Sequence, residues 1–343
     1  MTLLNSLELI WFVIFVILLC GYAILDGFDL GVGMLHLFSK SDEERRLMLN
    51  SIGPVWDGNE VWLVTAGGAL FAGFPVAYAT LCSAFYLYIM IFLCGIIFRA
   101  VAIEFRSKRP MDWWRWMWDA LFSLASLIIA VALGLILATL IRGIPLDNQY
   151  EYTGNIWNEI GVYDILVSIM TVSLFLVHGS IFLLMKLEGE FHNKIRNWVN
   201  PLIIFFIMSY AITTVSTLIW FPHMVEAIKE RKIFFLIAII NMFAIANIPR
   251  EIRFGRDSRA FASSIINIIC LLILYGIGTF PNIIRASNDP LNNSVTIYNG
   301  ASSETTLQIL LIIAAIGIPM VLSYTFMIYY IFHGKVKIDN TSY

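Results

Sequence analysis

An uncharged apolar run, LIWFVIFVILLCGYAIL, occupies positions 9–25 and is followed directly by DGFDLGVG at 26–33. Because a membrane-spanning helix needs about 20 predominantly apolar residues, this stretch predicts a span that ends in two aspartates. A carboxylate at membrane depth costs roughly 2.5 kcal/mol or more. Asp26 and Asp29 are spaced i, i+3 and share one helix face, about 5–6 Å apart. Such a pair indicates a functional site facing the protein interior, and a proton is the expected cargo.

The composition predicts an integral membrane protein. The chain is 59% hydrophobic and only 13% charged, with a mean hydropathy of +0.80, whereas soluble domains carry about 25% charged residues. The absence of a basic patch with interleaved aromatic residues argues against a nucleic-acid partner. The sequence contains neither a phosphate-binding G-x-x-x-x-G-K-[ST] motif nor a metal-binding H-E-x-x-H motif, so we expect no metal site. The four cysteines lie in apolar segments without C-x-x-C spacing and are interpreted as packing residues.

We expect an all-α fold with nine transmembrane helices in a single membrane domain over 1–343. The predicted spans are 9–33, 55–74, 76–98, 117–141, 161–185, 199–221, 232–248, 261–281 and 307–332. They predict a first four-helix bundle over 9–141 that holds the sequence motifs, a second bundle over 161–281, and one peripheral helix at 307–332. No connecting loop is long enough for a separate soluble domain.

The distribution of basic residues predicts the orientation. An odd number of spans puts the termini on opposite sides, and cytoplasmic loops carry an excess of Lys and Arg. If the C-terminus is cytoplasmic, the other side receives only a few of the 22 basic residues: Arg142, Lys229, Arg231, Lys232 and Arg285. We therefore expect the N-terminus outside and the C-terminus in the cytoplasm.

With this orientation the charged residues of the first four spans converge near the cytoplasmic face. Short connections favour antiparallel neighbours, so we expect these spans to pack together. Their inner third would hold up to five carboxylates and one guanidinium: Asp26, Asp29, Asp57, Glu60, Asp119 and Arg99. Close carboxylates in a poor solvent titrate as a coupled unit, and one of them tends to hold a proton that it can pass on.

A purely structural interpretation stays open for some of these residues. Charges near helix ends can reach the interface, and acidic residues at a helix N-terminus interact favourably with the helix dipole. That accounts for Asp57 and Asp119 without a function, but Asp26 and Asp29 lie in the C-terminal half of their helix. Among the histidines only His178 is deep in a span, and a hydrogen bond to a neighbouring helix explains it better than metal ligation. We expect this chain to bind no haem directly.

These residues resemble a known family. The motifs are DGFDLGVGM at 26–34, ERRLMLNSI at 44–52, WDGNEVW at 56–62 and TAGGALF at 65–71. They continue with FR at 98–99, FRSK at 105–108 and WD at 118–119, and LEGE at 187–190 is a later echo. Together they resemble subunit II of the cytochrome bd quinol oxidases, most densely over 1–155.

The resemblance implies a nine-helix subunit paired with a subunit I of the same fold as a heterodimer in the bacterial inner membrane. Subunit I would carry two b-type haems, haem d and the quinol-binding loop. The complex would oxidise ubiquinol or menaquinol, reduce dioxygen to water and take protons from the cytoplasm. A small third subunit, and a structural quinone or lipid between the helices, are compatible with the resemblance.

The resemblance also implies roles for single residues. Asp57 matches the acidic residue of the proton route, Trp62 the aromatic residue near the oxygen entry, and Arg99 a buried arginine near the subunit interface. Asp26 and Asp29 match the paired aspartates of the family. Two departures are Glu60, at a position where one branch commonly has glutamine, and His178, where glutamine can occur.

Two other functions remain open at this stage. A proton-coupled secondary transporter would also use membrane carboxylates, but it predicts an internal repeat with matched interruptions at mid-membrane, which the sequence lacks. A structural membrane scaffold would use Asp26, Asp29 and Asp57 for assembly alone.

Overall fold

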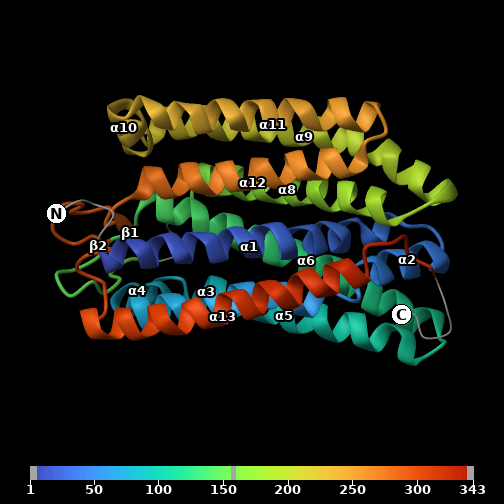
Figure 1. The fold of residues 1–343 in the computed structure, drawn as a ribbon, viewed down its shortest axis with the longest axis horizontal. Coiled ribbons are helices and arrows are strands. Elements are labelled where there is room, and N and C mark those ends of the chain that lie inside the picture. Colours follow the sequence, from blue (N-terminus) through green and yellow to red (C-terminus); the bar gives the residue numbers. More distant parts are fainter. Residues whose placement is uncertain (1–5, 156–159, 338–343) are drawn as a thin grey trace.

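The computed structural model describes residues 6–155 and 160–337, apart from the side chain of Ala227, and is almost entirely helical (Figure 1). The first half contains α1 (Leu7–Leu35), η2 (His36–Phe38), α2 (Asp42–Ile52), α3 (Trp56–Gly73), α4 (Pro75–Ala84), α5 (Tyr86–Phe105), η3 (Arg106–Lys108) and α6 (Asp112–Arg142). The second half contains α8 (Val162–Lys186), α9 (Gly189–Trp220), α10 (His223–Glu230), η4 (Lys232–Phe234), α11 (Phe235–Arg253), α12 (Asp257–Thr279) and α13 (Glu304–Ile331). A short antiparallel hairpin, β1 (Asn282–Ile284) and β2 (Val295–Thr296), precedes α13.

Two of the long helices, α1 and α13, begin where a serine side chain satisfies a free backbone N–H group. Ser6 accepts a hydrogen bond from the N–H of Leu9 at the start of α1, at 3.3 Å. Ser303 accepts one from Thr306 at the start of α13, also at 3.3 Å. A serine at the N-cap typically stabilises a helix by about 1 kcal/mol. The apolar runs predicted from sequence therefore start at defined residues.

Eight helices of the described chain are long and apolar enough to cross a membrane, and α3 with α4 make a ninth candidate bent by 120°. The predicted span at 76–98 has the wrong boundaries. Pro75 occupies the first turn of α4, and the chain leaves helical geometry at Phe85 before α5 runs on to Phe105. Neither Pro nor Gly lies at or beside Phe85, so no helix-breaking residue predicted that break.

The predicted end of the seventh span is also wrong. We expected this span to end at 248, directly before Pro249, but α11 continues through the proline to Arg253. A proline inside a helix removes one backbone hydrogen bond, and this helix tolerates the loss.

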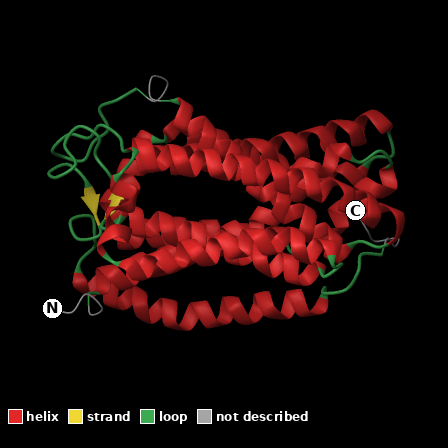
Figure 2. Cartoon of the chain, turned by 90° about the horizontal axis from the view of Figure 1, so that it is seen from above, coloured by secondary structure: helices red, strands yellow, loops and turns green. Residues whose placement is uncertain are grey.

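Helix α1 lies in the middle of the molecule. It packs against α3, α6, α8, α12 and α13. In Figure 1, α9 and α11 lie along one edge, α8 and α12 beside them, and α3, α5 and α13 along the opposite edge. Figure 2 shows the hairpin and its loops at one end of the helices. This is the end where α1 begins, whereas α2 and the last turn of α13 lie at the other end. The acidic end of α1 is thereby surrounded by other helices.

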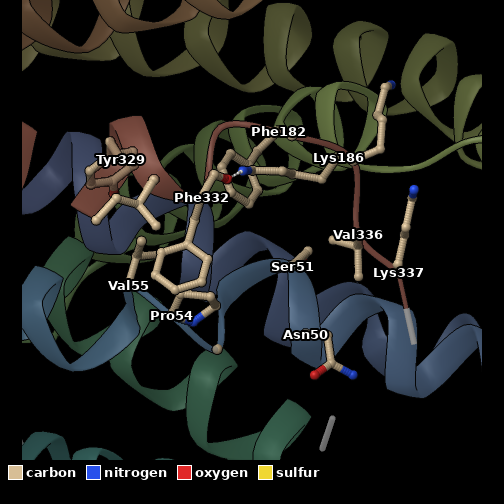
Figure 3. Close-up of a pocket in the computed structure, with 14 residues that line it drawn as sticks. Asn50, Ser51, Pro54, Val55, Phe182, Lys186, Tyr329, Phe332, Val336 and Lys337 are labelled. Carbon is tan, nitrogen blue, oxygen red and sulfur yellow. Dashed lines mark hydrogen bonds between the residues drawn. The ribbon is translucent and has the colours of Figure 1, made fainter. Parts of the chain in front are cut away.

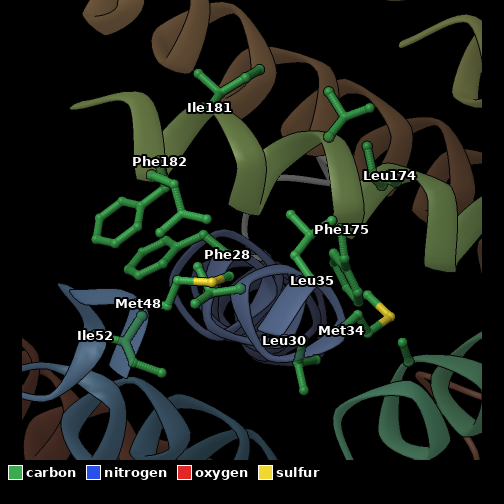
Figure 4. Packing of buried hydrophobic residues seen from close by; sticks show 14 of the residues in the cluster. Phe28, Leu30, Met34, Leu35, Met48, Ile52, Leu174, Phe175, Ile181 and Phe182 are labelled. Atoms are coloured by element: carbon green, nitrogen blue, oxygen red, sulfur yellow. The ribbon is translucent and has the colours of Figure 1, made fainter. Parts of the chain in front are cut away.

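Helices α1 and α8 pack closely against each other in the core (Figure 4). Phe28 stacks on Phe182 with ring centroids 3.9 Å apart. Further along, the backbones of Gly31 and Gly179 meet: a Cβ built on Gly179 would lie only 2.6 Å from the carbonyl carbon of Gly31. Small residues allow such close approach between membrane helices. The contact fixes the position of Asp26 and Asp29 relative to α8.

Candidate functional site

Arg99, on α5, is the centre of a buried charged cluster. Its side chain is 0% exposed, and its guanidinium holds the carboxylate of Asp26 with both terminal nitrogens. One of the two hydrogen bonds, from Nη1 to Oδ2, measures 3.1 Å. Glu60 on α3 places Oε1 2.9 Å from Nη2 of the same arginine. A two-pronged arginine–carboxylate contact is geometrically specific as well as strong, so it ties α1 to α5.

Asp29, one turn further along α1, has different partners. Asn59 on α3 donates from Nδ2 to Asp29 Oδ2 at 2.7 Å and to the backbone carbonyl of Leu25 at 3.2 Å. Tyr329 on α13 in turn donates its hydroxyl to Asn59 Oδ1 at 3.0 Å. Within the described residues Asp29 Oδ1 is buried without a hydrogen-bond partner. The paired aspartates therefore face one region but connect to different helices.

The cluster contains more acid than base. Asp26, Asp29 and Glu60 supply three carboxylates, and Arg99 supplies one guanidinium. The structure brings these four predicted residues together. Asp57, three residues before Glu60 on α3, is exposed instead and makes none of these contacts. Both residues were expected in the cluster, and the structure places Glu60 in it and Asp57 outside it.

Trp62 lies on α3 beyond the cluster. Its side chain is half-buried against Gly21 of α1, where a Cβ would fall 2.0 Å from the indole ring. The ring therefore needs a residue without a side chain at position 21. This packing fixes the tryptophan between α1 and α3.

Asp119 was expected in the same cluster but belongs to a second one. It is 0% exposed and accepts from Arg106 Nε at 2.5 Å and Arg45 Nη1 at 2.9 Å, with His36 Nε2 at 2.6 Å. Arg106 also reaches Asp42 at 2.7 Å. The expected single cluster is therefore wrong, because Asp119 lies about two turns into α6, beside η2, η3 and α2, where these partners lie. Arg115 also binds Asp42, at 3.2 Å, so three arginines accompany two aspartates, as in a structural ion-pair network.

Sequence reasoning missed the basic members of this second cluster. Arg45 and Arg106 stood inside recognisable motifs, ERRLMLNSI and FRSK, but were counted only for orientation. Both arginines lie at or near the short turns η2 and η3. This position between the long helices was the signal that could have identified them as partners of Asp119. His36, the third partner of Asp119, was not among the predicted site residues.

His178 has both ring nitrogens engaged. Nδ1 lies 2.8 Å from Ser264 Oγ on α12, and Nε2 lies 2.9 Å from the carbonyl of Ile24 on α1. A carbonyl can only accept, so Nε2 donates and Ser264 donates to Nδ1. The ring also stacks on Phe261 at 4.7 Å. The predicted hydrogen bond to a neighbouring helix is confirmed, and neither nitrogen of His178 is free to ligate a metal.

The arrangement of these helices has known counterparts. The sequence profile described as cytochrome bd terminal oxidase subunit II matches residues 7–332. The chain belongs to this family. It is 31% identical to the cytochrome bd-I ubiquinol oxidase subunit 2 of Escherichia coli K12, over 96% of this chain and 95% of that one. It is 32% identical to the cytochrome bd ubiquinol oxidase subunit 2 of Bacillus subtilis, over 97% of each chain.

The fold is shared with a solved structure. The bd oxidase from Geobacillus thermodenitrificans matches with a TM-score of 0.79 at 18% identity, over 95% of this chain and 98% of the other. The predicted resemblance is therefore confirmed, and it extends well beyond residue 155. This cytochrome bd subunit is an integral membrane protein and a component of a terminal oxidase complex in a respiratory chain.

Proposed function

We propose that the chain is subunit II of a quinol-oxidising terminal oxidase in a bacterial cytoplasmic membrane. The observation that carries this proposal is the family match over 7–332. Relatives from Escherichia coli and Bacillus subtilis are named as ubiquinol oxidase subunits. The complex would transfer electrons from quinol to dioxygen and form water. Its partner would be a haem-carrying subunit I with two b-type haems and haem d.

Haem held by the partner would supply the electron transfer and the oxygen reduction. His178 does not fit haem ligation because both of its ring nitrogens are hydrogen-bonded to protein groups, and His36 is held by Asp119 through Nε2. The remaining described histidines, His192, His223 and His333, lie near helix ends. The part we assign to this chain is therefore support of the interface, proton delivery and oxygen access.

We assign proton delivery to the Arg99 cluster. An excess of carboxylates in a low-dielectric interior is relieved when one of them takes up a proton. Asp57 lies exposed, three residues from Glu60 on α3, and would collect protons from the cytoplasmic side. Glu60, and then Asp26 with Asp29, would hold the proton further inside. Arg99 would keep Asp26 in place throughout, and Trp62 would border the oxygen path.

This role requires the predicted orientation, with the N-terminus outside and the C-terminus in the cytoplasm. The support for it is the distribution of Lys and Arg between the two sides. In this arrangement the Arg99 cluster lies towards the cytoplasmic ends of α1, α3 and α5. We also retain the two four-helix bundles with α13 as the peripheral helix, which agrees with the exposed apolar surface of α13.

The test is to purify the chain together with the subunit encoded beside it and record a visible spectrum. We expect haem b and haem d bands, and their absence would overturn the assignment. Asp57→Asn should then slow oxygen consumption while haem content stays unchanged. Glu43→Gln, an exposed acid on α2, serves as the matched control. Unchanged oxygen consumption in Asp57→Asn would remove Asp57 from the proton route.

The transporter alternative is separated by a different measurement. It predicts matched interruptions in two halves of the chain. Within the described residues there is one sharply bent helix pair, α3 with α4, and α9, α11 and α13 continue through their internal prolines. Substrate uptake by the isolated chain in liposomes would support the transporter and contradict the oxidase subunit.

A further inference from the structure

Tyr22 lies on α1, one turn before Asp26. The two residues are spaced i, i+4 and therefore share one face of the helix. The tyrosine side chain is only 3% exposed, and its hydroxyl lies beside the carboxylate of Asp26 and close enough to Arg99 and Glu60 to interact with their charges. Tyr22 is thus a polar member of the Arg99 cluster that neither the sequence motifs nor the proposed proton route includes.

The hydroxyl of Tyr22 is buried and makes no hydrogen bond of ordinary geometry with the described residues. A buried tyrosine hydroxyl usually has a partner, because leaving it unpaired costs free energy. A second tyrosine near the paired aspartates does have one: Tyr329, which lines the cavity shown in Figure 3, donates to Asn59. Tyr22 therefore keeps its donor and its acceptor lone pairs free beside Asp26.

Asp26 needs such a group because of the way in which Arg99 holds it. Both carboxylate oxygens accept from the guanidinium, which carries donors only and cannot accept a hydrogen bond. A proton that is taken up by Asp26 must therefore point away from Arg99 and find an acceptor elsewhere. The hydroxyl of Tyr22 is a neutral acceptor beside this carboxyl, whereas the carboxylate of Glu60 is itself bound to Arg99.

A hydroxyl suits both protonation states of Asp26. It can donate to the carboxylate while Asp26 is ionised, and it can accept from the carboxylic acid once Asp26 holds a proton. The change needs only a rotation about the C–O bond of the tyrosine, so the contact between Asp26 and Arg99 stays in place. Without this acceptor, the new O–H group of Asp26 would be buried and unpaired next to a cation, and proton transfer through Asp26 would be slow.

We propose that Tyr22 is the positioning residue that lets Asp26 take up and release a proton. Its hydroxyl accepts from the protonated form and donates to the ionised form, while Arg99 holds Asp26 in both. This role rests on the assignment of proton delivery to the Arg99 cluster. It adds to that route an uncharged residue of α1, one turn nearer the start of the helix.

The test is Tyr22→Phe, which removes one oxygen atom and keeps the ring that packs in the core. Oxygen consumption by the co-purified complex is measured in ordinary and in heavy water. We expect Tyr22→Phe to slow oxygen consumption about tenfold, which corresponds to the loss of one hydrogen bond. The solvent isotope effect should rise, because proton transfer through Asp26 becomes the slow step. Haem content and the unfolding midpoint should stay unchanged, since the hydroxyl has no partner among the described residues.

Tyr275→Phe on α12 is the matched control, because Tyr275 packs against a separate apolar cluster that contains Ala138 and Tyr163. It should match the unmodified complex in rate, isotope effect and haem content. Equal rates in Tyr22→Phe and the unmodified complex would overturn the proposal, and so would a slower rate with an unchanged isotope effect.

Loss of the haem-containing complex in Tyr22→Phe would also overturn the proposal, because the hydroxyl would then serve the fold and not the proton. Failure of the proposed function has a different signature. In that case the unmodified complex itself would lack haem bands or consume no oxygen, and the role of Tyr22 would fall with it.

Discussion

Removing one carboxylate from the Arg99 cluster should have an effect that depends strongly on which one is removed. Asp26 is 1% exposed and engages Arg99 with both oxygens, whereas the side chain of Glu60 is 15% exposed and meets the same arginine through one oxygen. Asp26→Asn leaves a fully buried guanidinium without its main counter-charge. Breaking a buried ion pair in this way costs about 3–5 kcal/mol.

Glu60→Gln is the matched control because it removes one negative charge from the same arginine. Arg99 then keeps its two-pronged contact with Asp26, and the lost contact is partly exposed to solvent. Partly exposed ion pairs contribute about 1 kcal/mol or less. The unfolding free energy should therefore fall at least about 2 kcal/mol further in Asp26→Asn than in Glu60→Gln.

The measurement is denaturation of the co-purified complex by sodium dodecyl sulfate, followed by tryptophan fluorescence, with the visible spectrum as a second readout of assembly. We expect Asp26→Asn to lower the unfolding midpoint and the yield of haem-containing complex. Glu60→Gln should assemble normally. Equal destabilisation by the two substitutions, or a larger effect of Glu60→Gln, would show that Asp26 is not the main counter-charge of Arg99.

Three further substitutions test other contacts by the same denaturation assay. Gly179→Ala should lower the unfolding free energy by roughly 2 kcal/mol, because its Cβ would meet the backbone of α1, whereas Gly68→Ala in open space should not lower it, because alanine favours a helix over glycine by up to about 1 kcal/mol. Asp119→Asn should cost about 3 kcal/mol or more, because it removes the buried carboxylate that Arg106 and Arg45 share and leaves Arg106 with only the exposed Asp42, and a cost under 1 kcal/mol would contradict the network described here. Tyr329→Phe should cost about 1 kcal/mol through its lost hydrogen bond to α3, while Tyr330→Phe on the exposed face should be neutral.

The site residues that could be predicted from sequence are those whose free-energy cost in the membrane depends only on their own helix. Asp26 and Asp29 had to face the interior because two carboxylates on an apolar helix are expensive wherever they lie. Arg99 followed as the nearest guanidinium at the same depth. The length of the apolar runs was sufficient to predict the long helices, and the sequence motifs were sufficient to predict the family.

What the sequence did not predict depends on how the helices rotate and where they break. Asp57 and Glu60 have the spacing of one helix face, yet α3 is turned so that only Glu60 reaches Arg99. Asp119 is separated from the cluster because α6 begins beside η2 and α2, a position that no spacing along the chain specifies. The break at Phe85 lacks a proline or glycine. Asn59 and Tyr329 connect Asp29 to α13. They carry no charge, and no sequence motif or spacing predicted that they would meet.

The contact between Gly31 and Gly179 has a consequence for biosynthesis. Chains are made from the N-terminus, so α1 enters the membrane long before α8 exists. Until α3, α5 and α8 arrive, Asp26 has no arginine, Asp29 has no amide partner, and the glycine face of α1 contacts lipid. Each unpaired carboxylate raises the cost of that early state by roughly 2.5 kcal/mol. The first helix to be synthesised therefore depends on the later ones, and a ribosome that stops before residue 186 leaves it incompletely packed in the bilayer.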